Sequence, residues 1–149
     1  MRSIILFVFT CIIFFFSSCS KTLDDRIPGN WQLSRSWKQG LFDRDYFQTG
    51  YENGVFTFMD NGNATYTSAT DTLTGYWRTG RYVNNYYNSG SGRWEDASMK
   101  YLEIYLVNFQ QNKLLNWRFD DFHFRDTWHE IRAEQYSVGR DRVYEFDRK

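Results

Sequence analysis

The feature that most constrains this chain is the stretch from residue 51 to 78. Two runs of alternating apolar and polar residues are joined there by Asp60-Asn61-Gly62, and a third run ends in Thr74-Gly75-Tyr76-Trp77. A period of two is typical of a β-strand with one buried face. Because short turn sequences separate the runs, the stretch predicts an antiparallel β-meander and an all-β protein.

The turn between the first two runs decides which residues face each other. A two-residue turn at Asn61-Gly62 would mix apolar and polar side chains on each face. A three-residue loop, with Gly62 in the left-handed conformation, instead pairs Phe58 with Ala64 and Phe56 with Tyr66. We predict this second register because it leaves one apolar face and one polar face.

The N-terminus has the pattern of an export signal. Arg2 is followed by an apolar run from residue 4 to 16, which is too short for a typical membrane span. The small residues Ser17-Ser18 before Cys19 resemble the lipobox of bacterial lipoproteins. This resemblance implies cleavage before Cys19 and acylation of its sulfur and amino group. The alternatives are an ordinary signal peptide or an uncleaved anchor.

The segment after Cys19 bears on location. Cys19-Ser20-Lys21 followed by Asp24-Asp25 resembles the signal that sends some lipoproteins to the outer face of the outer membrane, the alternative being a plain solvated linker. We expect an outer-membrane lipid anchor through acyl chains on Cys19, with the domain either exposed at the cell surface or facing inward. The chain divides into a signal peptide (1–18), a lipidated cysteine with its tether (19–27) and one domain (28–149).

Charge and cysteine content exclude several classes of function. The chain has 18 Lys+Arg and 18 Asp+Glu, and removal of residues 1–18 takes away only Arg2 of these. The mature chain therefore has no basic field to attract nucleic acid. Cys11 leaves with the signal and Cys19 is acylated, so no thiol remains for a disulfide or a thiolate metal site.

The rest of the chain continues the β pattern. Aromatic residues make up 21% of the chain, and this composition fits strands better than helices. The Asp120-Asp121 pair breaks the phase of one run, and a bulge there restores a single inward face. Residues 39–50 and 84–98 are expected to be loops. With the three strands of the meander, further strands at 30–38, 99–108, 114–124, 128–136 and 142–148 predict an eight-stranded antiparallel up-and-down β-barrel.

Several motifs support this fold by resemblance. Gly29-Asn30-Trp31, the Asp60-Asn61-Gly62 hairpin, Thr74-Gly75-Tyr76-Trp77 and the closing run from Tyr144 to Arg148 resemble the small bacterial lipocalin-like lipoproteins, over about residues 28–149. The resemblance implies a lipocalin-like barrel that carries a small hydrophobic ligand. It also implies that Trp31 seals the barrel floor and that Arg148, or alternatively Arg142, packs across it.

Alternation along residues 30–38 places Trp31, Arg35 and Trp37 on the inward face. Arg35 is then a hook for an anionic ligand, or else it forms an internal salt bridge or reaches water at the barrel mouth. An eight-stranded barrel is wide enough to hold one small ligand or to be filled by large side chains. The residues predicted to bind a ligand are Arg35, Trp37, Phe56, Tyr66 and Trp77.

No pattern in the chain predicts an enzyme. His123 and His129 are the only histidines, and the turn expected between them separates the two imidazoles. No Gly-x-Ser-x-Gly elbow or phosphate-binding glycine loop is present. We therefore expect no catalytic residue, metal or cofactor. Two functions stay open: a barrel that binds a small hydrophobic or amphipathic ligand, and a filled barrel that contacts a protein or glycan through its long loops.

Overall fold

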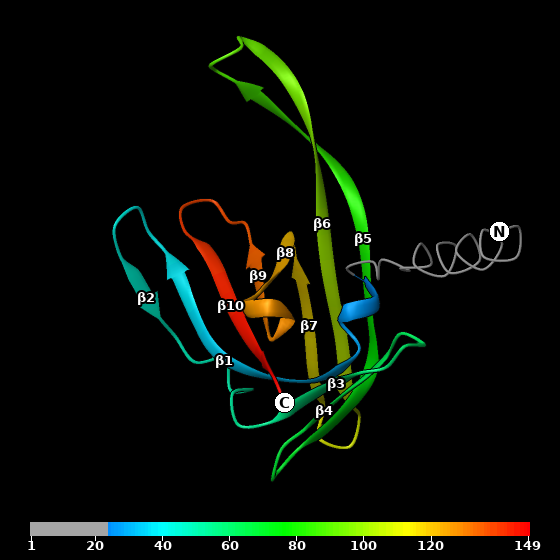
Figure 1. Cartoon of the computed structure of the whole chain (residues 1–149). Helices are drawn as coiled ribbons and strands as arrows, with labels where there is room; N and C mark the ends of the chain where they lie inside the picture. The colour runs from blue at the N-terminus through cyan, green and yellow to red at the C-terminus, as the bar shows by residue number, and fades with distance from the viewer. Residues whose placement is uncertain (1–23) are drawn as a thin grey trace, which may run out of the picture.

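The computed structural model of the chain describes residues 24–149, so the predicted signal peptide, Cys19 and most of the tether lie outside it. The described residues form one antiparallel sheet of ten strands, which confirms the all-β class (Figure 1). Two single-turn 3-10 helices accompany it, η1 (Asp24–Arg26) and η2 (Asp126–Trp128). The strands are β1 (Gly29–Gln39), β2 (Arg44–Tyr46), β3 (Val55–Phe58), β4 (Asn63–Thr67), β5 (Thr72–Asn88), β6 (Arg93–Asn108), β7 (Lys113–Phe119), β8 (Asp121–Arg125), β9 (Glu130–Gln135) and β10 (Asp141–Arg148).

The sheet curls but does not close. Its order is β7-β6-β5-β4-β3-β1-β10-β9-β8, with β2 paired to β1, so β7 and β8 lie at the two ends. These two strands are consecutive in the chain, and Asp120 alone separates them. At that residue the chain stops pairing with β6 and starts pairing with β9. A barrel with a continuous ladder is therefore not shown, and the predicted strand 114–124 is two strands.

The seam between the two ends is bridged by single hydrogen bonds instead of a ladder. The Asp120 N–H donates to the Glu134 carbonyl at 2.7 Å. The side-chain amide of Gln135 donates to the Arg118 carbonyl at 3.0 Å. Phe119 and Phe122, on either side of the break, both lie in the core. The phase change predicted at the Asp pair therefore restores one inward face, as expected.

The predicted register of the meander is confirmed. Phe56 pairs with Tyr66 and Phe58 pairs with Ala64. Gly62 has a φ of +83°, the left-handed conformation that the three-residue loop requires. The Trp77 N–H donates to the Gly62 carbonyl at 2.8 Å and so ties the turn to β5.

Aromatic rings fill the interior of the curled sheet. The ring centroid of Phe56 lies 4.9 Å from that of Tyr66 and 5.7 Å from that of Phe146. Trp117 packs in the same group, with its ring 5.9 Å from that of Phe56 and 5.4 Å from that of Tyr144. Tilted and edge-to-face ring contacts at these distances add to the stabilisation from burial. The core is therefore packed with rings where the predicted ligand cavity would lie.

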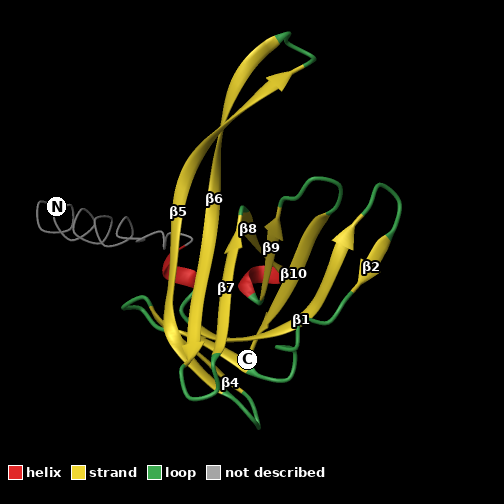
Figure 2. Cartoon of the chain, turned by 180° about the vertical axis from the view of Figure 1, so that it is seen from behind, coloured by secondary structure: helices red, strands yellow, loops and turns green. Residues whose placement is uncertain are grey.

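The segment predicted to be a loop at 84–98 is a regular hairpin. β5 and β6 pair without interruption from Thr74 with Val107 to Asn88 with Arg93. Their neighbours stop much earlier, β4 at Tyr76 and β7 at Leu102. Residues 81–100, which we call the arm, therefore project beyond the sheet as a two-stranded ribbon (Figures 1 and 2).

Candidate functional site

Trp31 and Arg148, the pair expected at the barrel floor, are brought together. They are register partners, and the Arg148 guanidinium carbon lies 4.6 Å from the centroid of the Trp31 ring. Arg148 Nη2 donates to the Arg26 carbonyl at 2.5 Å, and the Trp31 indole N–H donates to the Ile27 carbonyl at 2.7 Å. The chain after η1 is thereby tied over one end of the core. The alternative residue, Arg142, lies over Phe47 instead.

Arg35 does not face the core, so its predicted orientation is wrong. Leu33 pairs with Phe146 and Arg35 pairs with Glu145, so Ser34 is an extra residue in β1. This bulge changes the phase of the strand and turns Arg35 to the outer face of the sheet. Its side chain is 54% exposed, and Nη2 lies 2.7 Å from Glu145 Oε2.

Trp37 follows the same change of phase, and its predicted inward orientation is also wrong. It pairs with Val143, and both residues are buried outside the main core cluster. The Trp37 ring lies 6.0 Å from the ring of Tyr46, which belongs to β2, a strand in the predicted loop 39–50. The guanidinium of Arg132 lies over the ring at 5.4 Å. Trp37 is therefore buried by β2 and by arginine side chains rather than by a ligand cavity.

Arg35 belongs to a charged network. The salt bridge considered as an alternative for Arg35 is present, but it lies on the outer face, and its partner Glu145 was not identified from the sequence. Glu145 lies between two core residues of β10, and only 4% of its side chain is exposed. Arg125 Nη1 lies 3.4 Å from Glu145 Oε1 and 3.6 Å from Glu130 Oε1. The buried carboxylate is thus neutralised from two strands, as a desolvated charge requires. An acidic residue between Tyr144 and Phe146 was the one signal in the sequence.

Phe56, Tyr66 and Trp77 lie inside the core, as their alternation predicted. Phe56 and Tyr66 are no more than 2% exposed. The Trp77 indole N–H donates to the Met59 carbonyl at 2.9 Å. The five residues predicted to bind a ligand are therefore not brought together, because Arg35 and Trp37 lie on the opposite face of the sheet.

The described part of the chain has several surface pockets. One, of ≈ 340 Å³, lies beside Tyr51 and Lys113. A pocket of ≈ 500 Å³ is lined by Arg35, Ser36 and Tyr46 among others, and we call it the Arg35 pocket. A third, of ≈ 650 Å³, takes residues from both 3-10 helices, and we call it the η pocket. Phe56, Tyr66 and Trp77 line none of the three.

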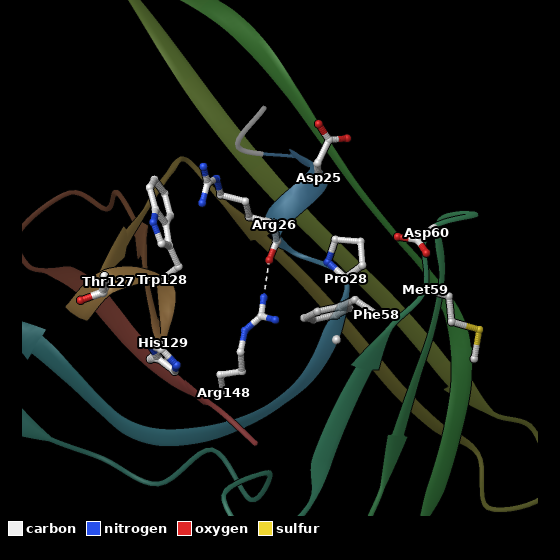
Figure 3. Close-up of a pocket in the computed structure, with 11 residues that line it drawn as sticks. Asp25, Arg26, Pro28, Phe58, Met59, Asp60, Thr127, Trp128, His129 and Arg148 are labelled. Carbon is white, nitrogen blue, oxygen red and sulfur yellow. Dashed lines mark hydrogen bonds between the residues drawn. The ribbon is translucent and has the colours of Figure 1, made fainter. Parts of the chain in front are cut away.

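The η pocket collects side chains from four separate segments (Figure 3). The Arg26 guanidinium lies 3.7 Å from the centroid of the Trp128 ring. Asp126, Thr127 and Trp128 have φ values of 44°, 51° and 78°, a left-handed run that is strained in residues other than glycine. This turn places Trp128 and His129 at the pocket wall. The residues that line the η pocket include Arg26, Phe58, Met59, Trp128, His129 and Arg148.

The acidic pair at the seam has structural partners. One Asp120 carboxylate oxygen accepts the Tyr136 N–H at 2.8 Å. Burial raises the pKa of Asp121. Burial, with the nearby carboxylates of Asp121 and Glu134, raises the pKa of Tyr136 to about 12, so its hydroxyl stays protonated at neutral pH. The Asp120 hydrogen bond ties the chain after β9 to the seam.

Within residues 24–149, no group of three or more His, Cys, Asp and Glu side chains is arranged to hold a metal ion. In the same part of the chain, no helix is both long and apolar enough to cross a bilayer. Comparison with protein-family models, curated proteins and solved structures found no match for this chain.

Proposed function

We propose that this chain is a non-enzymatic envelope protein, anchored to the outer membrane by acyl chains on Cys19, that binds a partner protein through its arm. The observation that carries this proposal is the contrast between a filled interior and a free ribbon. Phe56, Tyr66 and Phe146 occupy the interior with contacting rings. No residue of the arm belongs to that core, and most of its side chains are exposed to solvent.

The chemistry of the arm suits contact with a protein. Tyr87 and Trp94 are 55% and 72% exposed, and their rings lie 5.7 Å apart in an edge-to-face contact. Exposed tyrosine and tryptophan on a pre-formed hairpin are typical anchors of interfaces. The outer edges of the arm carry no ladder partner, because pairing with β4 ends at Tyr76 and pairing with β7 ends at Leu102. A free strand edge is a template for pairing with another chain.

Photocrosslinking in intact cells tests this proposal. A benzoylphenylalanine is introduced in place of Trp94 in one variant and in place of Leu114 in a matched control. Leu114 is also exposed, at 58%, but it lies in β7, outside the arm. We expect a discrete protein adduct from position 94 and none from position 114. Equal adducts, or none from either position, contradict a partner at the arm. Loss of the position-94 adduct after glycosidase treatment of the cells assigns the contact to a glycan instead.

The location has a test of its own. Cys19→Ser is expected to abolish labelling with a radioactive fatty acid and to release the protein from the membrane. Protease added to intact cells then reports surface exposure, since it degrades a surface-displayed chain and spares one that faces inward. Unchanged acyl labelling in the Cys19→Ser variant contradicts the anchor.

A second function is supported by the Arg35 pocket. Its volume of ≈ 500 Å³ exceeds the size of about 300 Å³ that is usual for ligand sites. The Ser36 hydroxyl on its wall is buried and has no hydrogen-bond partner among the described residues. A small amphipathic carboxylate fits this combination, with Arg35, which also pairs with Glu145, as its counter-charge. Native mass spectrometry of protein from its own envelope is expected to show an extra mass that Arg35→Leu removes, and a bare wild-type mass contradicts this function.

A further inference from the structure

The η pocket lies where the described chain begins. Arg26 and Pro28 line it, and only residues 20–23 separate Cys19 from the start of η1 at Asp24. An extended segment of that length spans at most about 18 Å. With the acyl anchor of the proposed function, on which this inference rests, the tether holds the pocket within reach of the lipid headgroups.

Two guanidinium groups dominate the pocket. Arg148 is fixed over Trp31, and its Nε is buried without a hydrogen-bond partner among the described residues. Arg26 is held against the Trp128 ring. Guanidinium groups with free donors match the oxygens of a phosphate better than any other side chain.

The remaining walls complete the chemistry of a lipid headgroup. Met59 and Trp128 are 40% and 41% exposed, so apolar side chains reach the pocket rim on two sides. Tryptophan favours the boundary between water and acyl chains, where its ring is apolar and its N–H is polar. Asp60 lies across the pocket from Trp128 and next to Met59 (Figure 3). A carboxylate at that position attracts an ammonium group.

We propose that the η pocket binds the headgroup of a zwitterionic phospholipid of the membrane to which the chain is anchored. The phosphodiester lies between Arg26 and Arg148, the ammonium group faces Asp60, and the glycerol end leaves past Met59 and Trp128. A headgroup bound beside the tether fixes the orientation of the body, and with it the direction in which the arm projects. A flexible tether alone leaves that direction undefined.

The NMR signals of the two histidines can report binding at the η pocket. His129 lines the η pocket, whereas His123 lies in β8 and does not line it. Acylated mature protein, labelled with ¹³C and ¹⁵N in histidine only and held in maltoside micelles, is titrated with dihexanoyl phosphatidylethanolamine. We expect the His129 ring signals to shift with saturation while those of His123 stay in place. No shift of the His129 signals overturns the proposal.

A pair of variants assigns the effect to the guanidinium. Arg26→Gln removes one of the two guanidinium groups of the pocket, the one over Trp128. Arg44→Gln removes a comparable arginine outside the pocket, 5.1 Å over Trp37. We expect Arg26→Gln to weaken the lipid affinity roughly tenfold or more, because a charge-assisted hydrogen bond is lost, and Arg44→Gln to leave it unchanged. Equal effects of the two variants overturn the assignment.

Further probes separate the sources of phosphate and the charge of the lipid. Inorganic phosphate and glycerophosphoethanolamine are expected to shift His129 only at much higher concentration, and equal potency assigns the pocket to a soluble phosphate and overturns the lipid. If the anionic dihexanoyl phosphatidylglycerol binds more tightly than the zwitterionic lipid, the proposed attraction between Asp60 and the ammonium group is wrong. Acyl labelling of Cys19 is measured on the same preparation. Labelling without a shift of the His129 signals contradicts the headgroup site but not the acyl anchor. A shift of the His129 signals without labelling contradicts only the anchor.

Discussion

The body and the arm are built from the same kind of strand but are held together differently. In the body, which is the described chain outside the arm, most strands bury at least one face. Residues such as Phe56 and Phe146 touch rings from several other strands. In the arm, ring contacts and hydrogen bonds are mostly local, as between Tyr87 and Trp94. The stability of the body therefore comes from burial, whereas the arm keeps its shape through ladder hydrogen bonds and local side-chain pairs. Regions of the second kind open more readily and are available for binding.

The largest expected difference between the two regions is the loss of unfolding free energy when an aromatic ring is removed. Phe56→Ala is expected to lower the free energy of unfolding by about 3–5 kcal/mol, because it removes a fully buried ring and leaves a cavity. Trp94→Ala is expected to change it by less than about 0.5 kcal/mol, because the ring is largely exposed. Chemical denaturation followed by circular dichroism measures both values. Similar losses in the two variants show that the arm belongs to the same cooperative core.

The outer-face charge network gives an intermediate effect. Arg35→Leu is expected to lower the free energy of unfolding by about 1–2 kcal/mol, because Glu145 stays buried with only Arg125 beside it. Arg35 is 54% exposed, which keeps the loss below that of a fully buried pair. Arg93→Leu, an exposed arginine of the arm, is the matched control and is expected to change stability by less than about 0.5 kcal/mol. If Arg35→Leu leaves the free energy of unfolding unchanged, solvent or another group compensates the charge of Glu145.

How far the sequence predicts the structure depends on whether its signals are local. The register of Phe56 against Tyr66 follows from alternation and the Asp60-Asn61-Gly62 turn, and it is confirmed. The bulge at Ser34 has no comparable signal, because a serine is equally compatible with regular pairing. The orientations of Arg35 and Trp37 were therefore predicted wrongly.

Two further features depend on contacts that a local pattern does not contain. The arm is rich in Asn, Gly and Ser, which favours a loop, yet Tyr87 and Trp94 pair across the ribbon and keep it regular. The η pocket is assembled from segments as far apart as Arg26 and Arg148. Neither residue is distinguished in the sequence as part of a pocket, although Arg148 was expected to pack across Trp31.

Shortening the arm tests its independence with a smaller effect on stability. Residues 84–97 are replaced by Asn-Gly, so that Val83 and Ser98, which are register partners, flank a two-residue turn. We expect the free energy of unfolding to change by less than about 1 kcal/mol, because the removed segment lies outside the core. The adduct to the partner is expected to disappear when the crosslinker is placed at Val83, the exposed residue that remains at the new tip. A large loss of stability contradicts an arm that is independent of the body.

The smallest effect is confined to the tip of the arm. The Glu95 carboxylate accepts hydrogen bonds from the Asn88 amide at 3.0 Å and from the Ser91 hydroxyl at 2.6 Å. The Tyr86 hydroxyl donates to it at 3.0 Å. The hydrogen bonds from Asn88, Ser91 and Tyr86, in that order, hold the pKa of Glu95 below its ordinary value of 4.5.

Because the folded pKa is the lower one, the ionised carboxylate favours the ordered tip. This stabilisation is complete above the pKa of the unfolded chain and is lost as the pH falls through the folded value. Between about pH 6 and about pH 3 we expect amide exchange at Ser91 and Gly92 to accelerate beyond the intrinsic pH trend, while the amide of Phe56 in the body stays protected. Glu95→Gln keeps the size of the side chain and removes its titration, so its tip should show no such acceleration. If the wild-type tip and the Glu95→Gln tip respond alike, the carboxylate does not order the arm, and the ladder with the Tyr87–Trp94 pair is sufficient to hold it.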